Sequence, residues 1–469
     1  MVFSSFRFLF LFLPVTLLIN YVLPKKFSNT FLLIVSLLFY YYGEKGLTLL
    51  LLLSICWNFV FALVIERQQR QTKDYAYSYL VLCVVGNLSL LFYYKYLLFF
   101  IELIGITSIV ESSFLKGISM PIGISFFTFH GLSYVVDVYR KHTSASKNIL
   151  DLGLYLAYFP QLIAGPIIKY HDIYVELKNR VILLTEVYSG INRFIRGLAK
   201  KIILANNFAF IADEIMNTPT MELSSVSAWV GILCYTLQIY YDFAGYSDMA
   251  IGLARMMGFH FKENFNYPYI ATSIQDFWRR WHMSLSTWFK EYVYIPLGGN
   301  QRKNGRVILN LLIVFILTGI WHGASINFLV WGLIHGLFII LERVVKFSKT
   351  TSYSFLRRVY TLLVVIFSWV FFRVESFEGS CIYLQKLVAC DVEGSNYFLT
   401  LITPYTLLLF LVGIVFVIPV KSYIYTSINQ SSSTVNFSYL VSIFHLLLLL
   451  FSLMELSSLS YNPFIYFRF

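Results

Sequence analysis

Long apolar runs, separated by short polar and often basic segments, repeat along the whole chain. They cover residues 2–23, 27–42, 47–64, 75–100, 118–138, 150–168, 188–215, 227–259, 307–317, 356–372, 399–420 and 437–459. A helix that crosses the hydrocarbon core of a membrane needs roughly 20 apolar residues, so the chain has room for about ten to thirteen spans. The pattern therefore predicts an all-α integral membrane protein that crosses the membrane many times.

Prolines interrupt two of these runs. Pro121 stands near the start of the run 118–138, and Pro160 and Pro166 lie six residues apart in the run 150–168. Proline removes a backbone donor and kinks or breaks a helix, and such a break within a membrane is tolerated only where protein covers it. We therefore expect a bent or re-entrant segment at residues 150–168.

The run 188–215 begins with several basic residues. Arg193, Arg196 and Lys200 follow one another at spacings of three and four, which places them on one face of a helix. Basic residues along one face of an otherwise apolar helix are typical of a helix that lies in the membrane interface. This segment is therefore predicted to be an amphipathic helix that enters the membrane from the cytoplasmic surface.

Composition and charge agree with a membrane protein. The 469 residues are 58% hydrophobic and 13% charged, whereas a soluble protein is about 25% charged. No long polar linker divides the chain, which predicts a single polytopic membrane domain over residues 1–469. The net charge of +12 comes from short basic clusters between apolar runs. Such clusters are typical of cytoplasmic loops beside membrane lipids and do not indicate a nucleic-acid partner.

Several motifs of well-known enzymes and pumps are missing from the sequence. It contains no G-x-S-x-G, no P-loop, no H-E-x-x-H and no cysteine pair at metal-binding spacing. A self-contained serine hydrolase and an ATP-driven pump are therefore not expected, and neither is a bound metal.

His322 lies near the turn of a predicted helical hairpin. It follows Arg306, the last residue of a basic cluster, by 16 residues, which is roughly 24 Å along a helix. Basic residues return at Arg343, and Gly319 and Gly323 next to the histidine leave room for backbone or substrate. An ionisable side chain at such depth in a membrane is by default a functional candidate. The alternative is a core histidine that binds a neighbouring helix.

His282 is a second candidate, in the segment WRRWHMS. Trp278, Arg279 and Arg280 precede it, and indole and guanidinium groups are typical of a belt at the headgroup level. That belt explains the tryptophan and arginines but not the histidine. Histidine suits general base catalysis because its ordinary pKa lies near neutrality.

Two other polar residues surround His322 in the sequence. His335 lies 13 residues after it, about 220° around a continuous helix, and is predicted to be structural. Asn310 lies 12 residues before it, roughly 120° away, and reaches it only through a bend.

Two aspartates interrupt the apolar run 227–259. Asp242 and Asp248 are six residues apart and therefore lie on different faces of a helix. Either one is expected to pair with an arginine or to hold an imidazole in its working tautomer. The alternative is a buried ion pair that fixes the position of the helix.

Seven stretches of the chain resemble the membrane-bound O-acyltransferase family, and most closely its bacterial branch for alginate and peptidoglycan O-acetylation. They are MPIGISFFTFHGLSYVVDVYR (120–140), YFPQLIAGPI (158–167), RGLAKKIILAN (196–206), YYDFAGYSDMAIGLARMMGF (240–259), FNYPYIATSIQDFWRRWHMSLSTWFKEYVYIPLGGNQ (265–301), LTGIWHGASINFLVWGLIHG (317–336) and YNPFIYFRF (461–469). The resemblance implies a polytopic helical ring around a central tunnel, with an acyltransferase core at residues 120–373.

The family pairs a histidine of the WRRWH segment with one of the WHG segment, which fall on His282 and His322. The resemblance implies that His322 acts as a general base or a transient acyl carrier, and that His282 orients or protonates a reacting group. The donor would be a cytoplasmic acetyl thioester, expected to be acetyl-CoA, with no bound cofactor. Candidates for binding the donor or substrate are Trp278, Arg279, Arg280, Asn310, Trp321 and Asp242.

The resemblance also implies a location and a partner. A protein of this branch would lie in the bacterial cytoplasmic (inner) membrane. It would pass the acetyl group to a separate extracytoplasmic polysaccharide O-acetyltransferase. Peptidoglycan is slightly preferred over alginate as the polysaccharide, because the chain offers no feature specific to an alginate partner.

Two other functions stay open. A D-alanyl transfer protein for teichoic acid shares the WHMS-type segment, although the stretch 295–302, IPLGGNQR, is more similar to the acetylation branch. A proton-coupled transporter or channel is compatible with intramembrane histidine and aspartate residues and with broken helices. Transporters often contain inverted internal repeats, and none is evident here.

Overall fold

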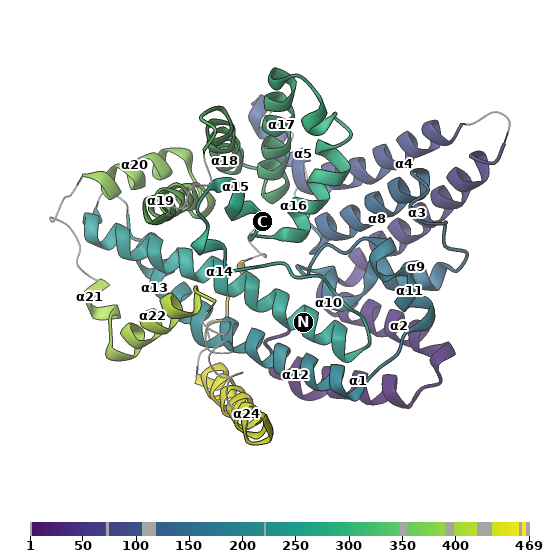
Figure 1. Cartoon of the computed structure of the whole chain (residues 1–469), viewed down its shortest axis with the longest axis horizontal. Coiled ribbons are helices and arrows are strands. Elements are labelled where there is room, and N and C mark those ends of the chain that lie inside the picture. Colours follow the sequence, from purple (N-terminus) through teal and green to yellow (C-terminus); the bar gives the residue numbers. More distant parts are fainter. Residues whose placement is uncertain are drawn as a thin grey trace. The chain divides into compact units, whose positions relative to one another are not determined.

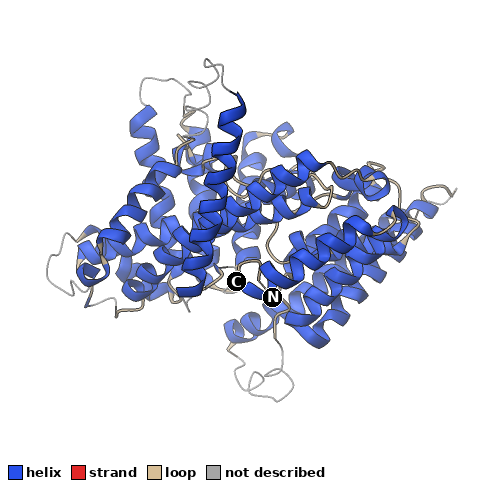
Figure 2. Cartoon of the chain, turned by 90° about the horizontal axis from the view of Figure 1, so that it is seen from below, coloured by secondary structure: helices blue, strands red, loops and turns tan. Residues whose placement is uncertain are grey.

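The computed structural model describes residues 2–71, 75–105, 119–219, 222–347, 354–389, 398–419, 434–458 and 462–465. Within these ranges every regular element is a helix (Figures 1 and 2). The all-α prediction is therefore confirmed. Tyr461 and residues 466–469 of the terminal stretch lie outside the described residues.

Six helical stretches of the described chain are long and apolar enough to cross a membrane. They are Lys25–Gln68, Ala76–Ile104, Asn304–His322, Ile326–Val344, Ser354–Arg373 and Tyr439–Ser458. The protein is therefore a multi-pass membrane protein. The ten to thirteen spans stay a prediction, because one of these stretches, Lys25–Gln68, is 44 residues long and the described residues also contain shorter apolar helices. The longest single helix of the described residues is α14 (Ser225–Met256), with 32 residues.

Two compact units make up the structure. One contains Met1–Phe194 and Met249–Lys262, and the other contains Ile195–Asp248 and Glu263–Phe469. The helices α12 (Leu184–Ala199) and α14 each contribute residues to both units.

The first unit is built around a group of apolar helices in which α3 packs against α4 and α8, and α2 against α9. Its elements before α12 are η1 (Phe8–Phe12), α1 (Leu13–Val22), α2 (Lys25–Glu44), η2 (Lys45–Leu47), α3 (Thr48–Gln68), α4 (Ala76–Leu91), η3 (Phe92–Tyr96), α5 (Leu97–Ile104), α8 (Ile124–Tyr139), α9 (Ile149–Ala157), α10 (Phe159–Leu162) and α11 (Tyr170–Asn179).

The proline-rich segment breaks as the sequence predicts. Helix α9 ends at Ala157, Tyr158 is non-helical with ψ 115°, and the short helix α10 begins immediately before Pro160. Most residues from 152 to 168 are buried. The predicted bend and its cover by protein are thus both confirmed.

The second unit holds the remaining helices. After α12 they are η4 (Lys200–Ala205), α13 (Asn206–Met216), α14, η6 (Pro268–Ile270), α15 (Ile274–Trp278), α16 (Met283–Phe289), η7 (Lys290–Tyr294), η8 (Gly299–Gln301), α17 (Asn304–His322), α18 (Ile326–Val344), α19 (Ser354–Arg373), α20 (Phe377–Val388), α21 (Phe398–Leu401), α22 (Pro404–Phe416) and α24 (Thr434–Ser458). Helices α17 and α18 form the predicted hairpin and pack closely along their length.

Two glycines allow the close approach of α17 and α18. A Cβ atom at Gly319 would overlap the carbonyl oxygen of Phe328, and one at Gly332 would overlap that of Phe315. Small residues at a helix contact let two backbones approach in this way within a membrane. The glycines therefore set the distance between the two helices that carry the WHG segment.

Replacing Gly332 by alanine is expected to push α17 and α18 apart. Overpacking a tight contact typically costs about 1–3 kcal/mol of stability, which thermal unfolding of the detergent-solubilised protein would measure. Gly305→Ala is the control, because Gly305 lies in the partner helix α17 with no atom within 4 Å of the added Cβ. Equal unfolding temperatures for the two variants would contradict the prediction.

Candidate functional site

His322 is the last residue of α17. The chain leaves the helix at Gly323, which is extended, and α18 begins after Ser325, whose hydroxyl accepts a hydrogen bond from the Phe328 backbone N–H. The histidine is 5% exposed. It therefore lies at the turn of the hairpin, enclosed by protein.

Aromatic rings surround this imidazole. The ring centroids of Trp321, Trp331 and Phe372 lie 4.9, 5.0 and 5.1 Å from that of His322, each in a T-shaped arrangement. Such edge-to-face contacts are the favoured geometry of aromatic pairs. They hold the imidazole plane in one orientation.

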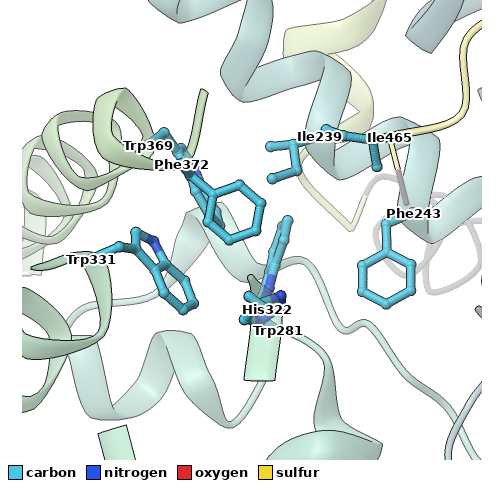
Figure 3. A pocket seen from close by; sticks show the side chains of 8 residues that line it. All are labelled: Ile239, Phe243, Trp281, His322, Trp331, Trp369, Phe372 and Ile465. Carbon is cyan, nitrogen blue, oxygen red and sulfur yellow. The ribbon is translucent and has the colours of Figure 1, made fainter. Parts of the chain in front are cut away.

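A small cavity of about 10 Å³ adjoins His322. A cavity of this size holds about one water molecule. Figure 3 shows aromatic and aliphatic side chains from several helices around the imidazole of His322, which is the titratable group of the lining. The lining residues are Ile239, Phe243, Trp281, His322, Trp331, Trp369, Phe372 and Ile465.

His282 precedes α16 and has a left-handed backbone conformation with φ 42°. Its side chain is fully buried, and its Nδ1 atom lies 3.2 Å from Oδ1 of Asn264. The Ser284 backbone N–H and hydroxyl donate to the same oxygen at 3.1 and 2.9 Å. A backbone N–H can only donate, so this atom is the carbonyl oxygen of the amide.

The hydrogen bond to Asn264 sets the tautomer of His282. Because an amide oxygen only accepts, Nδ1 of His282 carries the proton and Nε2 carries the lone pair of the neutral ring. Burial lowers the pKa of His282, because a charged imidazolium is poorly solvated there. The ring is therefore neutral at pH 7.

The structure brings the two predicted histidines to one site. The indole of Trp321 contacts both imidazoles, with centroid distances of 6.0 Å to His282 and 4.9 Å to His322. The ring centroid of Phe243 lies 4.6 Å from that of His282, and Phe243 also lines the cavity beside His322. Trp321, a predicted binding residue, thus contacts both imidazoles.

His335 belongs to a separate chain of hydrogen bonds. The indole N–H of Trp278 donates to its Nδ1 at 3.2 Å, and its Nε2 lies 3.0 Å from the hydroxyl of Ser368. That hydroxyl donates to the carbonyl of Val365, so it accepts from Nε2–H of His335. Both ring nitrogens are thus engaged in holding α15, α18 and α19 together, which is a structural role.

Trp278 and Arg279 line a second, larger cavity of about 830 Å³. Its walls carry three cationic side chains, two carboxylates and several hydroxyl and amide groups. The lining residues are Thr272, Ser273, Gln275, Asp276, Trp278, Arg279, Met283, Ser286, Thr287, Lys290, Tyr294, Asn300, Leu311, Ile339, Glu342, Arg343 and Phe347. Arg280 instead pairs with Asp276 at 3.0 Å and donates to the carbonyl of Asn266.

Asn310 does not lie beside His322. Helix α17 runs from Asn304 to His322 as one element, so the bend that such a contact would need is absent and 12 residues span about 18 Å. The Asn310 amide donates to the carbonyl of Leu297 at 3.2 Å. Asn310 therefore does not reach His322, because nothing interrupts the helix between them.

Asp242 and Asp248 both form ion pairs, with lysines in place of the expected arginine. Asp242 lies 2.9 Å from the ammonium of Lys201, and Asp248 lies 2.7 Å from that of Lys200. Asp242 also accepts a hydrogen bond from the Ile465 backbone N–H at 2.8 Å. The structure thus shows the alternative in which an ion pair fixes the helix.

Sequence reasoning overlooked several residues that shape this site, among them Asn264, Trp331, Phe372 and Ile465. Trp331 and Ile465 lie within stretches that carry the family resemblance, and Asn264 directly precedes another. The resemblance of those stretches to the family was therefore the signal in the sequence that could have pointed to these residues. Phe372 lies in an apolar run with nothing to distinguish it.

Asn264→Ala is expected to lower activity between about 10- and 100-fold, because an imidazole without its partner loses its fixed tautomer and orientation. Asn264→Asp keeps an acceptor oxygen and should recover much of this loss. Its carboxylate should also shift the pH profile upward, because a nearby negative charge favours imidazolium. Acyl transfer measured against pH checks both effects, and wild-type activity in the alanine variant would contradict them.

Comparison with known proteins connects this geometry to a family. The family model described as MBOAT, membrane-bound O-acyltransferase family, matches residues 36–384. This match begins well before residue 120, where the recognisable stretches start.

Three curated relatives illustrate the similarity. "Probable alginate O-acetylase AlgI" of Pseudomonas syringae pv. tomato is 41% identical, over 80% of this chain and 73% of its own length. "Peptidoglycan O-acetyltransferase" of Helicobacter pylori is 34% identical, over 83% and 80%. "Teichoic acid D-alanyltransferase" of Bacillus subtilis is 29% identical, over 55% and 68%.

Proposed function

Since the chain belongs to the membrane-bound O-acyltransferase family, we propose that it moves an acetyl group across the membrane for O-acetylation of an extracytoplasmic polysaccharide. One observation carries the proposal: His282 and His322 meet at the Trp321 indole in a buried, apolar site. An apolar, enclosed site strengthens the interactions that stabilise charge during acyl transfer. The transporter or channel alternative is set aside, because the family and these relatives are acyltransferases.

The larger cavity supports a phosphate-bearing thioester as donor, and we take acetyl-CoA as that donor. Arg279, Lys290 and Arg343 line the cavity, and their charges would attract phosphate groups. Trp278 lines the same cavity, and its ring centroid lies 5.7 Å from that of Trp331, whose ring contacts the imidazole of His322. Two aromatic residues, Trp278 and Trp331, would thus lie between a donor in this cavity and the imidazole of His322.

In the proposed reaction, the neutral imidazole of His322 removes the proton of an acceptor hydroxyl. The hydroxyl oxygen attacks the carbonyl carbon of the thioester, the C–O bond forms and the C–S bond breaks. The leaving thiolate takes up the proton from the imidazolium, so the products are an ester and a thiol. The only proton of that hydroxyl goes to His322, so His282, with its lone pair on Nε2, would instead orient a neighbouring N–H or O–H group of the acceptor by accepting its hydrogen bond.

We further propose that this protein lies in the bacterial inner membrane. The acceptor is then a separate extracytoplasmic acetyltransferase, which modifies the polysaccharide. Peptidoglycan and alginate are both candidate polymers. The alginate relative is 41% identical and the peptidoglycan relative 34% identical, so the comparison gives peptidoglycan no advantage. Both polymers therefore belong in the test.

The test removes the gene and restores it on a plasmid. Ester-linked acetate and ester-linked D-alanine are released from purified surface polymers by mild base and quantified. Loss of acetate from one polymer, with normal D-alanine and recovery on complementation, is the expected result. Loss of D-alanine alone would establish the teichoic acid alternative, and unchanged acetate on every polymer would overturn the proposed function.

A further inference from the structure

The segment of residues 462–465 closes one side of the cavity at His322. Ile465 is 4% exposed and contributes its side chain to the cavity wall, opposite a wall made of aromatic rings (Figure 3). Ile239 is the other aliphatic residue of the lining. A segment more than 140 positions after His322 in the sequence thus completes the space around the imidazole.

Buried polar contacts anchor this segment. Asp242 accepts from the Ile465 N–H at 2.8 Å and pairs with Lys201 at 2.9 Å, and the Lys201 ammonium also donates to the carbonyl of Pro463. The ring of Phe464 stacks on Tyr246 with centroids 4.8 Å apart. Each of residues 463, 464 and 465 is therefore held by a separate contact.

One face of α14 supplies both the anchors and part of the cavity wall. Ile239, Asp242, Phe243 and Tyr246 follow at spacings of three, one and three residues, and residues three or four apart share a helical face. Ile239 and Phe243 line the cavity, while Asp242 and Tyr246 hold the segment. The helix that anchors Ile465 therefore also contributes Ile239 and Phe243 to the cavity wall.

The cavity is small enough to select among acyl groups. Its volume of about 10 Å³ corresponds to one water molecule, which is close to the size of a single methyl group. We propose that Ile465 is a specificity-determining residue that limits the transferred group to acetyl by filling the space a longer acyl chain would need. This inference rests on the proposed function, since it concerns the acyl group of that reaction.

Shortening Ile465 should relax the selection. One methylene in an apolar pocket changes selectivity by about 10- to 200-fold. Ile465→Ala is therefore expected to raise the ratio of propionyl to acetyl transfer by about 10-fold or more. Ile465→Val should raise it less, because it removes one carbon atom.

The experiment uses the full-length protein in its own cells, grown with sodium propionate so that both acetyl and propionyl thioesters are present. Mild base releases the ester-linked acids from the surface polymers, and the propionate-to-acetate ratio is measured. Ile232→Ala is the matched control, because Ile232 is fully buried in the same helix α14 but does not line the cavity. Its ratio is expected to equal that of the wild type.

A raised ratio in Ile465→Ala, with a smaller rise in Ile465→Val, supports the inference. A wild-type ratio in an alanine variant that still transfers acetate overturns it. If the alanine variant transfers nothing, the valine variant decides by the same criterion. If both the alanine and the valine variant transfer no acyl group although their protein levels are normal, Ile465 has a structural role and the proposed selectivity is overturned. Ester-linked acetate that does not depend on the wild-type gene overturns the proposed function itself.

Discussion

His322→Ala is expected to lower ester-linked acetate on the surface polymer by about 100-fold or more, since a positioned general base contributes 10²–10⁴-fold to the rate. The imidazole is the titratable group in the wall of the small cavity, and three aromatic rings pack edge-to-face against it. Alanine keeps the helix but removes the base. Quantifying released acetate in cells that carry equal amounts of the two proteins measures the effect.

A second histidine provides the control for this prediction. His445 lies in the late apolar helix α24, where its Nδ1 atom is 2.7 Å from the carbonyl of Val441. His445→Ala makes the same chemical change outside the site and should leave acetylation near the wild-type level. Wild-type acetylation in the His322 variant would remove His322 from the mechanism.

Lys201→Met is expected to destabilise the protein by about 3–5 kcal/mol, because removing one partner of a buried ion pair leaves an uncompensated charge. The side chains of Lys201 and Asp242 are 3% and 2% exposed. Combining Lys201→Met with Asp242→Leu removes both charges and should recover much of the loss. Thermal unfolding of the solubilised protein would measure all three variants.

The adjacent lysine gives the matched comparison. Lys200 and Asp248 form a similar pair, but their side chains are 32% and 17% exposed. More exposed pairs contribute roughly 0–1 kcal/mol, so Lys200→Met should have a much smaller effect. Equal losses for the two lysine variants would mean that burial does not decide the energy of these pairs.

Local signals in the sequence predicted the elements that depend on local chemistry. Apolar length indicated the helices, and the prolines at 160 and 166 indicated the break after Ala157. The place of His322 at the turn of the hairpin followed from its distances to Arg306 and Arg343. The number of spans stays a prediction, because apolar content alone cannot distinguish a crossing helix from a buried, broken one such as α9 and α10.

The contacts that define the site were beyond such signals. Asn264 meets His282 because the chain turns back over 18 residues, and Ile465 meets Asp242 across 223 residues. No periodicity encodes either contact. The resemblance identified the two histidines as a pair, and the structure adds Trp321 as the residue that both of them touch.

Lys200 and Lys201 are neighbours in the chain, yet they reach aspartates six residues apart on α14, which is about 9 Å along that helix. A rod held at one point can still slide or pivot about it. Two ion pairs at different positions along α14 oppose both sliding of the helix along its axis and pivoting about either pair. The part of α14 between Asp242 and Asp248 is thus clamped in both translation and rotation. Phe243, which lines the cavity, lies within this part of α14 and is held in place with it.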